Sequence, residues 1–172
     1  MKNPTKLDFF VGSFISCIIN SAKKVPALID ETDNSKIIKL TTDNGDYNIY
    51  LKYSTNIRYS TRKKDGTEKV KITCDVLFNS KEYERLKNNF YEEKSTNLFI
   101  LVLTASQLSE PRIVAIPYDI GMKCLLAEDS NGTRRLTITK LGKEHTYNCY
   151  GIGDTGKIDN RVYVNWQKYF DN

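Results

Sequence analysis

The sequence predicts an α+β fold in a single domain spanning residues 1–172. A length of 172 residues suits one domain, and 40% hydrophobic with 11% aromatic residues is the composition of a folded chain. Segments with the two-residue period of strands are interspersed with segments that have the period of helices. We therefore expect a mixed, mostly antiparallel sheet with flanking helices, in the order α-βββ-α-β-β-α-ββ.

The first half begins with an amphipathic helix and continues as three sequential antiparallel strands. Apolar residues at spacings of three and four predict a helix over 6–24, which Pro26 ends, and a polar loop over 30–35 follows. Asn44-Gly45 and Asp65-Gly66 are typical of tight hairpin turns. The strands around these turns are expected at 36–41, at 47 extending towards 62, and at 70–78.

The second half is expected to contain a covered strand between two helices, followed by a hairpin. Ser80 is a candidate N-cap for a helix over 80–93. Residues 97–105 are apolar on both faces, which predicts a central strand. The remaining elements are expected as a strand at 112–116, a helix at 117–127, strands at 136–139 and 146–150, and a strand or short helix at 162–170.

Metal ligands and nucleophiles are scarce in this chain. His145 is its single histidine, so a site with two histidines cannot form within one subunit, and we expect this residue at the surface. The four cysteines, Cys17, Cys74, Cys124 and Cys149, lie far apart in apolar runs without zinc-ligand spacing. The pattern predicts buried thiols in a cytoplasmic protein, with no metal site and no cofactor.

The N-terminal segment has two interpretations. Residues 7–19 are largely apolar and follow a mildly basic start, as in a signal peptide. Asp8 interrupts that run, and the apolar positions repeat as one face of a helix, which favours a helix that packs in the core. Thirteen residues are too few to cross a membrane, so no membrane partner is expected.

A glycine pattern near the C-terminus, Gly151-x-Gly153-x-x-Gly156, matches the spacing of dinucleotide-binding loops. That mechanism needs a helix directly after the loop, whose N-terminus receives the pyrophosphate. Here a polar turn and a β-like run follow. We therefore expect a loop without a nucleotide site.

Basic residues gather on two predicted hairpins. Basic side chains interleaved with aromatic ones on a β-ribbon can neutralise phosphates and stack on bases. The alternative is a solvated hairpin whose lysines prevent unwanted strand pairing. The candidate binding residues are Arg58, Tyr59, Arg62, Lys63, Lys64, Lys69 and Lys71 on the first hairpin, and Arg134 and Arg135, near Lys140 and Lys143, on the second.

The element order over about 6–105 resembles the core of the PD-(D/E)XK nuclease superfamily. In that family, acids on the second and third strands and a nearby lysine hold a divalent cation and activate water. Tyr50 stands at the acid position of the strand that carries Lys52. The resemblance implies a Mg²⁺-dependent nuclease that uses Asp46, Glu68, Asp75 and either Lys71 or Lys52.

The leading interpretation is a small binding module without a catalytic centre of its own. Its basic hairpins would act on nucleic acid, or on an acidic or nucleic-acid-handling protein. The nuclease is the alternative from the enzyme class. A third interpretation is an oligomerising structural protein with a tyrosine-rich interface, since 11 of the residues are tyrosine.

Overall fold

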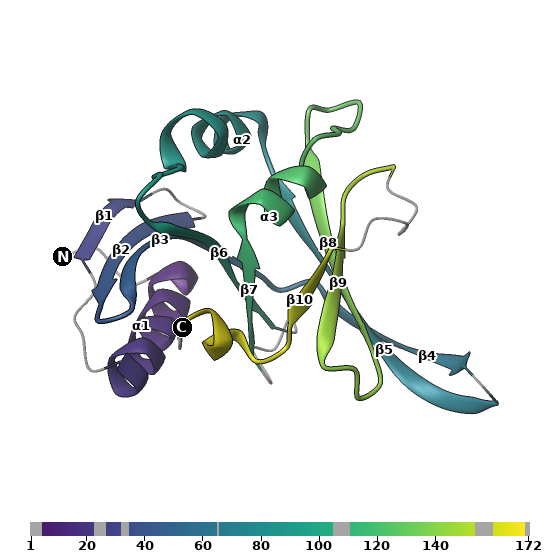
Figure 1. The fold of residues 1–172 in the computed structure, drawn as a ribbon. Coiled ribbons are helices and arrows are strands. Elements are labelled where there is room, and N and C mark those ends of the chain that lie inside the picture. The colour runs from purple at the N-terminus through teal and green to yellow at the C-terminus, as the bar shows by residue number, and fades with distance from the viewer. Residues whose placement is uncertain are drawn as a thin grey trace.

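The computed structural model describes residues 5–22, 27–31, 35–64, 66–104, 111–153 and 160–170. Over these residues the chain is α+β with mostly antiparallel strands, as the sequence predicts (Figure 1). The described strands form two five-stranded sheets, where we expected one. The order of the predicted elements is confirmed, with additional strands at 27–31 and 57–64.

The first sheet combines N-terminal strands with two strands from the middle of the chain. Its order is β1-β2-β3-β6-β7, and all neighbours are antiparallel except β3 and β6. β6 is buried on both faces, as the apolar run predicts. The strands span Ala27–Glu31 (β1), Ser35–Thr42 (β2), Gly45–Ser54 (β3), Thr96–Leu103 (β6) and Arg112–Pro117 (β7).

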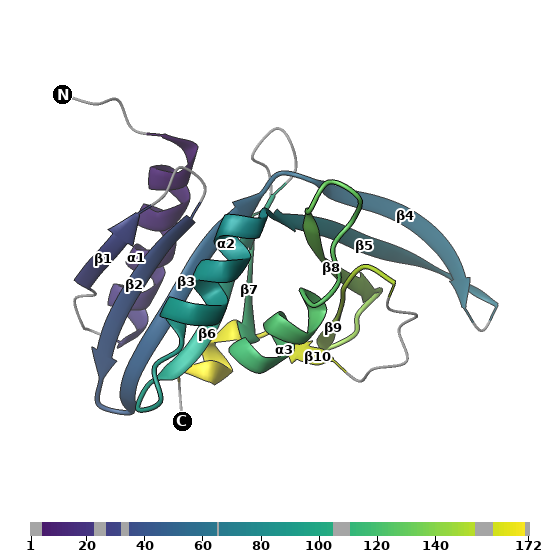
Figure 2. The same cartoon turned by 90° about the horizontal axis from the view of Figure 1, so that it is seen from above.

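The second sheet is antiparallel throughout, in the order β10-β9-β8-β5-β4. β5 is its longest strand, and the β4–β5 hairpin extends away from the body of the protein (Figures 1 and 2). The strands span Ile57–Lys64 (β4), Thr67–Phe78 (β5), Arg134–Leu141 (β8), Thr146–Tyr150 (β9) and Arg161–Tyr163 (β10).

Helices cover both faces of the first sheet. α1 (Lys6–Ala22) lies on one face, and α2 (Ser80–Arg85) and α3 (Tyr118–Cys124) lie on the other, towards the second sheet (Figure 2). α2 continues into a π-helical turn, η1 (Leu86–Phe90), and a 3₁₀ turn, η2 (Trp166–Tyr169), follows β10. α1 thus packs into the core, as its amphipathic pattern predicts.

The cap of α2 differs from the prediction by one residue. Asn79, and not Ser80, is the N-cap, and its side chain accepts a hydrogen bond from the Glu82 backbone N–H at 2.9 Å. The Glu82 carboxylate accepts in return from the Asn79 N–H at 3.1 Å. This reciprocal capping box satisfies two backbone donors and fixes Glu82 at the start of the helix.

Two hydrophobic clusters lie on opposite faces of the first sheet. The larger one fills the space between the two sheets and joins residues of β3, β5, β6, β7 and β8 with α2, η1 and α3. The smaller one lies between α1 and the first sheet, and it includes Leu7, Val11, Phe14 and Ile18 of α1. The first sheet is therefore the middle layer, and the second sheet is covered on one face by the larger cluster.

The segment expected as one strand from 47 towards 62 is divided at Thr55 and Asn56. β3 ends at Ser54 in the first sheet, and β4 begins at Ile57 in the second. The Ser54 hydroxyl donates to the Asp75 backbone oxygen at 2.9 Å, so the chain crosses beside β5 at this point. The expected three-stranded meander is replaced by two hairpins, β2–β3 and β4–β5, in different sheets.

The structure describes two of the three glycines in the pattern after β9, and the next described element along the chain is the strand β10. Gly151 lies against the end of α3, where a Cβ atom would be 1.9 Å from the Cys124 carbonyl oxygen. Gly153 adopts a positive φ of 75°. Gly156 lies outside the described residues. Close packing between β9 and α3 therefore explains why residue 151 is glycine.

The cysteines and the histidine follow the predictions with one exception. Cys74, Cys124 and Cys149 are buried, and burial raises the pKa of the Cys149 thiol. Cys17 is exposed, so the prediction of four buried thiols is wrong at this position. Its place on the outward side of α1 explains the difference. His145 is exposed, as expected.

Candidate functional site

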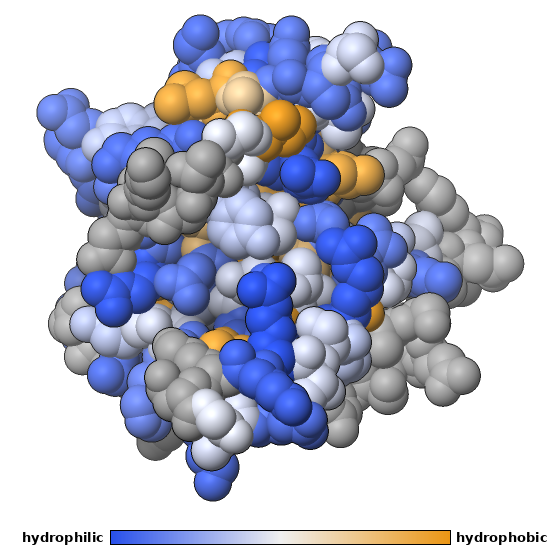
Figure 3. Space-filling view, turned by 90° about the vertical axis from the view of Figure 1, so that its right-hand side faces the viewer, coloured by the Kyte–Doolittle hydropathy of each residue, from blue (hydrophilic) through white to orange (hydrophobic). Residues whose placement is uncertain are grey.

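The second sheet has one covered face and one open face. Strand register places alternate residues of β4, β5, β8, β9 and β10 on the open side, opposite the larger cluster. Figure 3 shows that the side of the molecule formed by this sheet is mainly hydrophilic. We call this open side the basic face. Its described members include Arg58, Arg62, Lys69, Lys71, Thr73, Asp75, Arg135, Thr137, Thr139, Asn148, Tyr150, Arg161 and Tyr163. Among these, the side chains of Thr137 and Thr139 are buried.

Positive charge dominates the basic face. Asp75 is its one carboxylate among the described members, and it accepts from Arg58 Nη2 at 2.5 Å and from the Thr137 hydroxyl at 2.7 Å. Within the described part of the chain, no ion pair neutralises the four cations Arg62, Lys69, Lys71 and Arg135. The face therefore carries a net positive charge with several cations available to an anion.

The cations of the basic face are close enough to influence one another. The pKa of Lys71 is lowered by partial burial and by the like charge of Arg62. The pKa of Tyr150 is raised chiefly by burial, while Arg135, Arg58 and Arg62 act on this phenol in the opposite direction. Guanidinium groups from both β4 and β8 therefore act electrostatically on Tyr150. Basic residues of the two hairpins, which the sequence predicted as separate groups, therefore lie on one face.

Three predicted binding residues do not contribute side chains to the basic face as described. Tyr59 and Lys63 lie on the opposite face of the β4–β5 hairpin, paired with Ile72 and Glu68. Tyr59 is half-exposed, and its phenol helps to raise the pKa of the Arg112 guanidinium. The backbone of Lys64 pairs within the hairpin, but its side chain lies outside the described part of the structure.

Arg134 is engaged inside the protein instead. Its guanidinium lies 3.8 Å from the centre of the Tyr83 ring and donates to the backbone oxygens of Leu125 and Leu126 at 3.1 and 2.8 Å. It also pairs with Glu128 at 2.8 Å. These contacts hold the end of α3 and the loop after it against the second sheet. Arg134 is therefore a packing residue and is not part of the basic face.

The acids proposed for a nuclease do not converge in the structure. Asp46 lies at the start of β3, whereas Asp75 lies beside Ser54 at its end, about 26 Å along the strand at ~3.3 Å per residue. Glu68 points to the opposite face of β5 from Lys71. Among the described residues, no group of three histidine, cysteine or acidic side chains could hold a metal ion.

Lys52, the other nuclease candidate, is buried in an ion pair that the sequence did not reveal. Its Nζ donates to Glu82 Oε1 at 2.5 Å, and the Tyr50 hydroxyl donates to the same oxygen at 2.9 Å. Burial lowers the pKa of Lys52, and Glu82 acts against that shift. A pocket of about 210 Å³ beside this pair is lined by Lys52, Tyr53, Ser54, Thr55, Asn56, Asp75 and Leu77.

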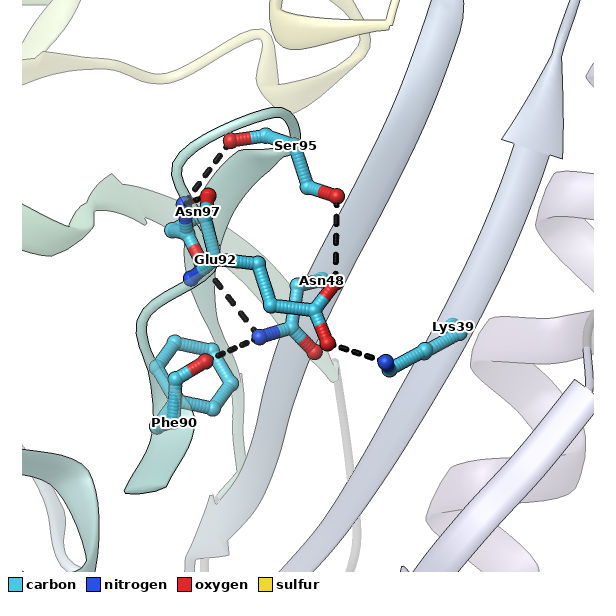
Figure 4. Close-up of polar contacts among 6 residues, drawn as sticks. All are labelled: Lys39, Asn48, Phe90, Glu92, Ser95 and Asn97. Carbon is cyan, nitrogen blue, oxygen red and sulfur yellow. Dashed lines mark hydrogen bonds and ion pairs between the residues drawn. The ribbon is translucent and has the colours of Figure 1, made fainter. Parts of the chain in front are cut away.

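A second buried polar group on β3 is structural. Asn48 donates through its amide to the Phe90 backbone oxygen and, at 3.3 Å, to Asn97 Oδ1 (Figure 4). Asn97 in turn hydrogen-bonds the backbone of Glu92, whose carboxylate pairs with Lys39. The network closes the turn between η1 and β6, and Asn48 Oδ1 is buried there without a hydrogen-bond partner among the described residues.

No family model matches the chain, and no curated protein or solved structure is significantly similar to it. None of the described helices is long and apolar enough to cross a membrane. The candidate functional site is therefore the basic face, where the described structure brings together the charged groups of two hairpins.

Proposed function

We propose that this protein is a nucleic-acid-binding module that acts through the basic face of its second sheet. The observation that carries the proposal is the group of four cations without ion-pair partners in the described structure, Arg62, Lys69, Lys71 and Arg135, on one open sheet face. Lysine and arginine side chains that neutralise phosphates supply most of the sequence-independent affinity for nucleic acid.

The composition of the face supports phosphate contacts. Residues two apart on a strand are about 6.6 Å apart and neighbouring strands about 4.8 Å apart, so the cations form a two-dimensional array. Thr73 and Asn148 place hydroxyl and amide donors among these cations, and both donor types bind phosphate oxygens. Tyr163 adds an exposed ring at one end, where Lys168 Nζ lies 4.5 Å from its centre.

Protection of a sheet edge does not explain the arrangement. Lysines on an edge strand prevent unwanted pairing, and β4 is an edge strand of the described sheet. Lys71 and Arg135, however, lie on β5 and β8, which have neighbours on both sides. Edge protection does not account for cations on central strands, whereas binding of an anionic ligand does.

Charge reversal on the basic face tests the proposal. We expect Arg62→Glu/Lys71→Glu to weaken binding of a fluorescent 20-nucleotide DNA or RNA by at least about tenfold at 50 mM salt, because two phosphate contacts are lost and the new carboxylates repel phosphate. Each lost contact should also reduce the salt slope by about 0.7 for a single strand. The matched control is Lys81→Glu/Lys87→Glu, which changes the same charge at exposed positions on α2 and η1. Fluorescence anisotropy over a salt series measures the affinity and the salt slope of each variant.

The outcomes separate nucleic acid from the other partners. Absence of binding by the unmodified protein at low salt would overturn the proposal and favour an acidic protein partner for the same cations. Equal loss in the two double variants would show that net charge matters and that the face does not. Retained binding in Arg62→Glu/Lys71→Glu would place the interface elsewhere.

A further inference from the structure

The outer end of the β4–β5 hairpin extends beyond the rest of the second sheet. β8 pairs with β5 only from Lys71 to Phe78. Just past β8, the turn after it still contacts the hairpin, because the Val70 backbone oxygen accepts from the Gly142 N–H at 2.8 Å. No described strand pairs with the hairpin beyond that point. We call the four pairs before Lys71 the ribbon tip: residues 61–64 of β4 and 67–70 of β5. At ~3.3 Å per residue the tip reaches about 13 Å past β8. Figures 1 and 2 show the hairpin curving away from the body.

Both faces of the ribbon tip carry exposed side chains, and its β5 strand borders a hollow that is also lined by residues 141–144. Arg62 and Lys69 point to the side of the basic face, whereas Lys63 and Val70 point to the other side. Val70 is 52% exposed, and Thr61, Arg62 and Lys63 are exposed as well. A strand pair with a free apolar side chain on one face and cations on both faces is not explained by packing.

We propose that the ribbon tip enters the major groove of duplex DNA, an inference that rests on the proposed function. The major groove is about 12 Å wide and admits a two-stranded β-ribbon. Arginine and lysine donate there to guanine O6 and N7, and threonine or small apolar side chains contact the thymine methyl group. The tip presents these residue types, from Thr61 to Lys63 and at Lys69 and Val70.

The composition and shape of the ribbon tip disfavour single-stranded nucleic acid and duplex RNA as its ligand. Single-strand binding depends on aromatic side chains on which bases stack, and residues 61–70 contain none. Duplex RNA has a deep, narrow major groove that side chains cannot read. With the tip in a DNA groove, Lys71 and Arg135 on the body of the basic face would meet the flanking phosphates. In this arrangement the ribbon tip contacts base edges in the groove, whereas the body of the basic face contacts the phosphate backbone.

A shortened hairpin isolates the contribution of the tip. Deleting 61–64 and 67–70 joins Ser60 to Lys71 through Asp65-Gly66. Ser60 and Lys71 form a pair of the same hydrogen-bonding type as Lys64 and Thr67, because pair types alternate along antiparallel strands, so register and faces are preserved. The matched control is Lys81→Gln/Lys87→Gln/Lys123→Gln, which removes the same net charge of three at exposed positions. Circular dichroism checks that each variant folds.

Methylation of guanine N7 by dimethyl sulfate reports occupancy of the major groove. We expect the unmodified protein to protect N7 in a saturated mixed-sequence 20-bp DNA duplex. We also expect it to bind that duplex at least about tenfold more tightly than the matching RNA duplex or single strand, because only duplex DNA offers a major groove that the tip can enter. The shortened variant should still bind DNA, but it should lose the protection of N7 and the preference for duplex DNA. The control should keep them.

Each result has one meaning. DNA binding without N7 protection, or equal affinity for duplex DNA, duplex RNA and single strands, would overturn the groove inference and leave the proposed function standing. Protection that survives in the shortened variant would also overturn it. No binding to any of these nucleic acids would overturn the proposed function itself.

Discussion

The buried pair of Lys52 and Glu82 shows how one residue's environment depends on a distant element. Both side chains are about nine-tenths buried, at 7% and 10% exposure, and Lys52 Nζ also lies 4.8 Å from the centre of the Phe78 ring. Strand alternation predicts that Tyr50 and Lys52 share a face. The sequence could not identify their partner, because Glu82 meets them only when α2 docks on the first sheet.

Removing the lysine should be strongly destabilising. Lys52→Met leaves the Glu82 carboxylate buried without a cation, and breaking such a pair from one side costs about 3–5 kcal/mol of unfolding free energy. Lys52→Met/Glu82→Gln should recover part of this loss, since it removes the unpaired charge. Urea unfolding at pH 7 measures the effect, with the exposed Lys87→Met as control. A loss below about 1 kcal/mol for Lys52→Met would contradict the interpretation.

At the level of elements, local turn chemistry was predictable and sheet membership was not. Gly45 and Gly66 adopt positive φ angles in the hairpins predicted from Asn44-Gly45 and Asp65-Gly66. The break after Ser54 has no glycine or proline to mark it, and the strand pattern continues across it. It arises because β3 pairs with β6, more than forty residues later, while β4 pairs with β5 in the other sheet.

The candidate site was predictable to the same degree. Alternation within the β4–β5 hairpin places Arg58, Arg62, Lys69 and Lys71 on one side, so their clustering follows from the sequence once the turn is known. The fates of Arg134 and Arg135 do not follow, because β8 begins earlier than the predicted strand at 136–139. Which of two adjacent arginines points outward is set by the register of β8 on β5.

The contact between α1 and the first sheet gives a pH-dependent prediction. Asp8 accepts from Lys36 Nζ at 2.6 Å and from the Thr5 backbone N–H and hydroxyl, each at 2.7 Å. These donors hold the pKa of Asp8 well below its ordinary value of 3.8. The folded state thus favours the ionised form, so the stabilisation is complete well above pH 4 and is lost as the pH falls further.

Asp8→Asn should therefore lower the Tm at pH 7, and the difference from the unmodified protein should shrink steadily below pH 4. Thermal melts followed by circular dichroism between pH 7 and pH 2.5 measure this convergence. Asp46→Asn, at an exposed position of β3, serves as the control and should not reproduce the pattern. A difference in Tm that stays constant across the range would show that the Lys36 contact does not stabilise the fold.

At the scale of the whole molecule, the net charge of +5 has a location that composition could not give. The cations of two separate hairpins meet on one open face because β5 and β8 are neighbours in the second sheet. The opposite face of that sheet shares its hydrophobic cluster with the first sheet. The basic face is thus supported by the core that joins the two sheets, which ties the integrity of the site to the fold as a whole.

This shared core predicts that the two sheets unfold together. Trp166, the single tryptophan, packs 5.8 Å from the Phe14 ring of α1 and 5.7 Å from Phe170, on the far side of the first sheet from the second. Its fluorescence therefore reports the α1 layer, whereas far-ultraviolet circular dichroism reports both sheets. In urea the two signals should give one midpoint and one slope, because neither sheet can lose its partner in the larger cluster and remain packed. Two separate midpoints would show instead that the α1 layer and the second sheet are independent units, and the basic face could then be lost while Trp166 still packs against α1.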